Sequence, residues 1–152
     1  MASLQTNKGV FRTLESRWRG VAVPTNYYVA LVTSAVAPTV DTNTFSQLTE
    51  IATGNGYTAG GIALTPGATD FDVLTEDDTN DRALVQIKDL VWTASVGSLP
   101  ASGNGARYAV LTDDNVTPGS REIFASFDLV SDRTVSVGQT LTIQNCELQL
   151  QN

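Results

Sequence analysis

The sequence predicts an all-β protein, an antiparallel β-sandwich of the jelly-roll kind with a short helix at the N-terminus and a second short helix in a loop. Strand-length apolar segments are separated by turn residues about every ten positions. The strand-favouring residues Thr and Val number 20 and 16 among 152 residues. Because a long series of antiparallel strands closes into two packed sheets, we expect one sandwich domain over residues 23–152, preceded by an arm over residues 1–22.

The arm contains a helical pattern. Val10, Phe11, Leu14 and Trp18 recur at spacings of three and four, which places them on one face of a helix that ends near Gly20. Two interpretations remain open. The apolar face closes the domain's own core, or it docks on a partner.

Strands are expected where apolar and β-branched residues follow one another or alternate with polar ones, at residues 27–33, 62–64, 71–74, 82–93, 106–111, 122–129, 134–137 and 140–150. Thr44 and Gln47 have capping-box spacing and predict a short helix over residues 46–52. In the last strand the apolar residues change parity, which predicts a β-bulge near Gln144 and Asn145.

Charge is distributed unevenly along the chain. The net charge is −7, yet the first 20 residues carry four basic residues and one acidic residue, so they contribute +3 and the remainder contributes −10. The acidic body is expected to repel nucleic acid. The arm is therefore the predicted docking surface for an acidic partner, and its candidate residues are Lys8, Phe11, Arg12, Arg17, Trp18 and Arg19.

Composition argues against most enzyme classes. The chain has no histidine and a single cysteine, Cys146, so it lacks the usual general base, an intrachain disulfide and a cysteine-based zinc site. The first residues lack the apolar segment of a secretory signal, and the longest apolar run is too short to span a bilayer. We expect a non-enzymatic protein without a cofactor, made in a cytoplasm and not bound to membranes.

A glycine-rich segment follows the predicted second helix and contains Gly54, Gly56, Tyr57, Gly60 and Gly61. It lacks the Lys-Ser/Thr pair of a phosphate-binding P-loop and does not open a helix. We expect a structural loop with positive φ angles at several glycines, with Tyr57 packed back onto the sheet.

Three further site interpretations remain open. The acidic residues Glu76, Asp77, Asp78 and Asp81 could supply oxygen ligands for Ca²⁺, although their spacing does not match an EF-hand, and no other metal site is expected. The same carboxylates could form a glycosidase pair. The aromatic residues could form a sugar-binding platform, and these are Tyr27, Tyr28, Tyr57, Trp92 and Tyr108.

Three segments resemble small virion proteins of tailed bacteriophages, especially head decoration (cement) proteins and tail-associated relatives. They are residues 24–35 (PTNYYVALVTSA), residues 50–61 (EIATGNGYTAGG) and residues 88–94 (KDLVWTA). The resemblance covers residues 8–112 and implies a structural protein on the outer capsid surface. Its implied partners are the major capsid protein and copies of itself, as a dimer or trimer. A tail or baseplate component and a carbohydrate-binding module of a receptor-binding protein are the alternatives.

Overall fold

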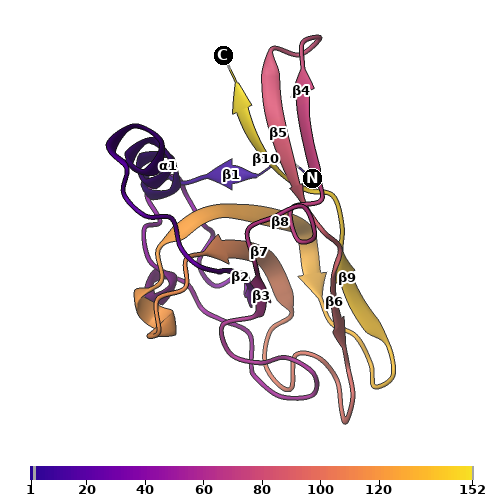
Figure 1. The fold of residues 1–152 in the computed structure, drawn as a ribbon. Helices are drawn as coiled ribbons and strands as arrows, with labels where there is room; N and C mark the ends of the chain where they lie inside the picture. The colour runs from indigo at the N-terminus through magenta and orange to yellow at the C-terminus, as the bar shows by residue number, and fades with distance from the viewer. Residues whose placement is uncertain (2, 152) are drawn as a thin grey trace.

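The computed structural model describes residue 1 and residues 3–151, and it shows an all-β antiparallel sandwich with one α-helix (Figure 1). The predicted fold class is confirmed. The elements in chain order are β1 (Leu4–Gln5), α1 (Asn7–Arg19), β2 (Tyr27–Val32), η1 (Phe45–Gln47), β3 (Ile62–Leu64), β4 (Val73–Asp77), β5 (Arg82–Ile87), β6 (Leu90–Thr93), β7 (Ala106–Thr112), η2 (Pro118–Ser120), β8 (Ile123–Arg133), β9 (Thr140–Ile143) and β10 (Cys146–Gln151).

The larger sheet has five strands in the order β1-β8-β7-β2-β3. Strand β2 lies inside this sheet, and its residues from Val29 to Val32 are buried, as the apolar run predicts. Strand β8 is the longest strand and pairs with both β7 and β1. The N-terminal segment is therefore joined to the sandwich by backbone hydrogen bonds.

The second layer consists of a two-stranded ribbon, β6-β9, and a three-stranded sheet, β10-β5-β4. Two segments that were each predicted as one strand, residues 82–93 and 140–150, each contribute one strand to the ribbon and one to the three-stranded sheet. The two strands of each segment are separated at Lys88–Asp89 and at Gln144–Asn145, where Asn145 has a φ of 56°. The predicted irregularity at Gln144 and Asn145 is thus present. Strands β4 and β5 form a hairpin that projects from the body of the sandwich beside β10 (Figure 1).

The main core fills the space between the layers. Phe127 and Leu31 from the larger sheet and Ile87 from the second layer are fully buried there, and Trp92 from the second layer is 3% exposed. Cys146 is also buried, and burial raises the pKa of its thiol to about 11, so the thiolate is disfavoured.

Two predicted elements are wrong. The predicted helix over residues 46–52 is a single 3₁₀ turn, η1, although the capping box of Thr44 and Gln47 is present. The chain then becomes extended because the amide of Ile51 donates to the carbonyl of Leu31 (3.1 Å). The side chain of Ile51 is buried there. The predicted strand over residues 134–137 is reduced to one bridge, between Val135 and Leu99.

Candidate functional site

Helix α1 has its apolar face turned to solvent. Phe11, Leu14 and Trp18 are 50%, 53% and 76% exposed, and Val10 is 40% exposed. Surface helices normally bury this face. The interpretation that α1 closes the domain's own core with these side chains is therefore wrong.

The opposite face of α1 packs on strand β8 through a small residue and a cap. Thr6 caps the helix by accepting a hydrogen bond from the amide of Gly9 (2.9 Å), while its own amide donates to the carbonyl of Phe124 (3.0 Å). A Cβ at Gly9 would lie 2.4 Å from that carbonyl oxygen, so only glycine allows this approach. The close packing fixes which face of α1 points outward.

An ion-pair cluster also anchors the helix. The Arg12 guanidinium donates from Nε and Nη2 to the two carboxylate oxygens of Glu122, at 2.6 and 2.8 Å, and from Nη1 to Glu15 at 2.6 Å. The ammonium of Lys8 lies 3.7 Å from Glu122. These bonds lower the pKa of Glu122, chiefly through the hydrogen bond from Arg12, and hold it ionised.

The predicted docking residues therefore divide into two groups. Arg12 and, more weakly, Lys8 hold α1 on the domain. Arg17 and Arg19 are exposed and make no ion pair with any residue in the described part of the chain. Phe11, Trp18, Arg17 and Arg19 thus form the outward part of the predicted site, and Leu14 completes it.

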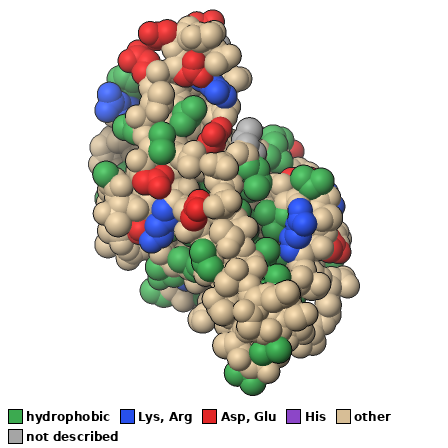
Figure 2. Space-filling view, turned by 90° about the vertical axis from the view of Figure 1, so that its right-hand side faces the viewer, with side chains coloured by type: hydrophobic (Ala, Val, Ile, Leu, Met, Phe, Trp, Pro, Cys, Tyr) green, Lys and Arg blue, Asp and Glu red, His purple; other side chains and the backbone are tan. Residues whose placement is uncertain are grey.

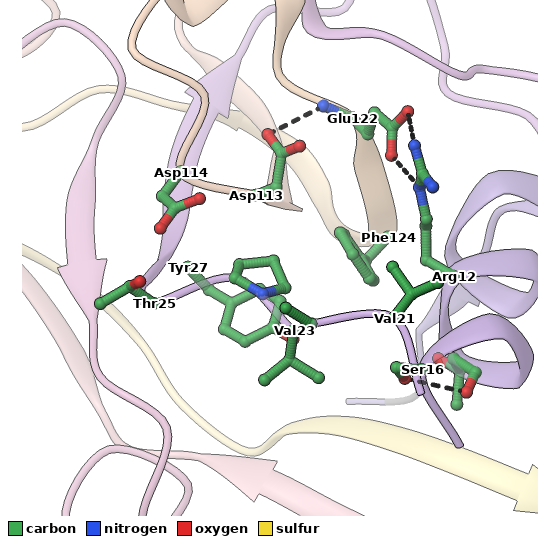
Figure 3. Close-up of a pocket in the computed structure, with 13 residues that line it drawn as sticks. Arg12, Ser16, Val21, Val23, Thr25, Tyr27, Asp113, Asp114, Glu122 and Phe124 are labelled. Carbon is green, nitrogen blue, oxygen red and sulfur yellow. Dashed lines mark hydrogen bonds and ion pairs between the residues drawn. The ribbon is translucent and has the colours of Figure 1, made fainter. Parts of the chain in front are cut away.

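A cavity of about 530 Å³ lies beside α1, and Figure 3 shows its lining. Its lining includes the ion pair of Arg12 and Glu122, with Asp113 next to Glu122 and Asp114 farther from that pair, together with Tyr27. Asp113 accepts from the amide of Glu122 (3.1 Å), and Asp114 accepts from the amide of Asn26 (3.0 Å). Burial raises the pKa of Asp113. These carboxylates shape loops, and the cavity adjoins the helix that carries the predicted docking residues.

The glycine-rich segment forms a loop in which Gly54, Gly56, Gly60 and Gly61 have positive φ angles of 107°, 104°, 82° and 79°. Tyr57 is 3% exposed and packs against Trp92. Its hydroxyl donates to Glu50 (2.7 Å) and accepts from the amide of Leu31 (3.0 Å). The same carboxylate oxygen of Glu50 accepts from the amide of Gly60 (2.6 Å). These hydrogen bonds hold this part of the loop against Glu50 and strand β2, so it has a structural role.

The acidic residues of the predicted calcium site lie on the β4–β5 hairpin. Asp77 accepts hydrogen bonds from Asn80 (2.8 Å) and Arg82 (2.9 Å), which lower its pKa. In residue 1 and residues 3–151, no three acidic, His or Cys side chains converge as a metal site would require. The calcium interpretation of Glu76, Asp77, Asp78 and Asp81 is not supported by this arrangement.

The aromatic residues do not form one exposed platform. Trp92 and Tyr57 lie in the core. Tyr27 packs edge-on against Phe71 and Phe124, and Tyr28 lies under the guanidinium of Arg121 at 3.8 Å from the ring centroid. Stacking on a sugar ring requires exposed faces, which the two core residues lack.

Sequence reasoning missed Thr6, Gly9 and Glu122. The signal for Thr6 was available, because a threonine just before a helical pattern is a common N-cap. Glu122 is 110 positions from Arg12, and no local pattern connects them. Neither a family model, nor a curated protein, nor a solved structure matches the chain. Within the described residues, no helix has the length and apolar character needed to cross a bilayer.

Proposed function

We propose that this chain is a non-enzymatic structural protein of a phage virion that decorates the outer capsid surface and stabilises the lattice of the major capsid protein. The observation that carries the proposal is the outward apolar face of α1, which the domain itself leaves uncovered. Apolar side chains gathered on one exposed helix face are typical of a protein-binding site. The virion setting comes from the sequence resemblance of residues 24–35, 50–61 and 88–94.

The composition of this face matches the central part of a protein interface. Trp18 and Phe11 are aromatic anchors of the kind that dominate binding energy. The guanidinium of Arg17 lies 5.9 Å from the Trp18 ring centroid, and Arg19, the next residue in the helix, is exposed. Because the rest of the chain is strongly acidic, these arginines are suited to an acidic patch on the capsid protein.

The helix is also held rigidly enough to serve as a docking element. Its cap at Thr6, the contact of Gly9 with β8 and the pair of Arg12 with Glu122 fix it on the sandwich before any partner arrives. A preorganised surface loses less conformational entropy on binding.

The location on the virion is tested by counting copies in purified particles by quantitative mass spectrometry and by a reconstruction of the intact virion. A decoration protein is present in hundreds of copies on the head lattice. A handful of copies confined to the tail would favour the tail or baseplate alternative and overturn the decoration proposal.

A further inference from the structure

A second apolar surface lies on the other side of α1, between the helix and the projecting sheet. Its cavity of about 190 Å³ is lined on the α1 side by Gln5, Gly9, Thr13 and Phe124. The sheet side is lined by Leu84 and by one face of β4, β5 and β10, whose apolar residues are Leu74, Ala83, Val85, Leu148 and Leu150. We call this surface the hairpin groove.

The register of the sheet shows that these side chains share one face. Leu74 and Leu148 both pair with Val85, and Leu150 pairs with Ala83 two positions along. Nearer the body, the same face continues into buried core residues, whereas at the projecting end Leu74 is 81% exposed and Leu150 is 58% exposed. The apolar face therefore extends past the point where the domain covers it.

Charges at the two rims of the groove are opposite. The end of the β4–β5 hairpin carries Glu76, Asp78 and Asp81, and none of them makes an ion pair within the described residues. Figure 2 shows acidic side chains gathered at this end of the molecule. On the α1 rim, Arg17 follows Thr13 by one helical turn and continues the row that lines the groove.

An occupant that fits this groove presents an exposed apolar side chain followed closely by carboxylates. The segment Leu74-Thr75-Glu76-Asp77-Asp78 of the chain itself has that pattern. We propose that two copies form a dimer about a two-fold axis, in which the β4–β5 hairpin of each copy docks on the other. Leu74 of each copy lies in the hairpin groove of the other, and each acidic hairpin end lies against the other copy's Arg17. Because the two hairpin ends carry like negative charges and repel one another, the two hairpins run in opposite directions.

The dimer proposal does not rest on the capsid proposal, although both use Arg17, and it is tested with the purified full-length protein alone. Light scattering after size exclusion, over a range of concentrations, is expected to show a dimer that dissociates on dilution. Leu74→Asp is expected to weaken the dimer at least about tenfold, because it places a charge in an apolar contact. Val116→Asp is the matched control, because Val116 is 95% exposed in a loop far from the hairpin in sequence, and it should leave the dimer intact.

A charge exchange provides the more specific test. Arg17→Glu alone and the pair Glu76→Lys with Asp78→Lys are each expected to weaken the dimer, and combining all three substitutions should restore it. Circular dichroism is used to check that each variant is folded. A monomer at every concentration, a dimer unaffected by Leu74→Asp, equal loss in Val116→Asp, or no restoration by the combined variant would each overturn the proposal.

Discussion

Arg12 and Glu122 lie 110 positions apart in the chain and form a two-point ion pair that joins helix α1 to the residue just before strand β8. The pair directs the polar side of the helix toward the domain. As a consequence, Phe11, Leu14 and Trp18 face solvent.

Glu122→Gln is expected to lower the free energy of unfolding by about 1 kcal/mol, since the pair is partly exposed and screened by solvent. The substitution removes a charge but keeps the shape of the side chain. Denaturant titration measures the effect. Asp128→Asn, which breaks the exposed pair with Arg107 away from α1, serves as the control and should cost less.

Acidification is expected to loosen α1. The pKa of Glu122 is lowered in the folded protein, so its stabilising contribution is complete above the ordinary glutamate pKa and is lost as pH falls through the lowered value. Asp70 has a lowered pKa because of Lys88 and acts in the same direction. Asp113, whose pKa is raised, acts in the opposite direction. Unfolding free energies measured from pH 7 to pH 3 should fall less steeply in Glu122→Gln than in the wild type, and equal slopes would show that the pair does not carry the dependence.

Gly56→Ala is expected to cost about 3 kcal/mol or more, because its Cβ would lie 1.9 Å from the carbonyl oxygen of Thr93 and the residue has a φ of 104°. Gly103→Ala is the matched control, since Gly103 has a φ of 75° but open space around its Cβ position. It should cost only about 1 to 2 kcal/mol. Thermal unfolding compares the two variants. Equal midpoints would mean that the loop above Tyr57 relaxes around the added methyl group.

Particles that lack this protein are expected to release DNA at a lower temperature than complete particles, because each bound copy favours the assembled lattice by mass action. Adding back the purified protein should restore the release temperature. A dye that reports released DNA during heating measures the difference. Identical release curves would argue for a role away from the head.

Local sequence patterns predicted the parts of the fold that depend on neighbouring residues. The helix ending at Gly20, the buried strand β2 and the irregularity at Asn145 all follow from spacing and turn chemistry. The segment after Gln47 was mispredicted because its pairing with β2 is a long-range contact that overrides a local helix signal.

The candidate site could be only half predicted. The apolar spacing at Phe11 and Trp18 identified the helix face, but it could not say whether that face points inward or outward. The answer depends on Gly9 against Phe124 and on Arg12 with Glu122, which are contacts between distant parts of the chain. For the same reason, sequence reasoning assigned Arg12 to docking although the structure uses it as an anchor.

The most direct test of the account is the binding of the protein to empty phage heads by co-sedimentation, with wild type compared with the variant Leu14→Ser with Trp18→Ser. Both side chains are more than half exposed, so the variant should fold normally. Val116→Ser controls for loss of an exposed apolar residue elsewhere. Removing a central tryptophan anchor typically costs about 2 kcal/mol or more, so the account predicts binding at least about 30-fold weaker for the variant and unchanged binding for the control. A folded variant that still occupies heads as fully as the wild type would contradict the assignment of α1 as the docking surface.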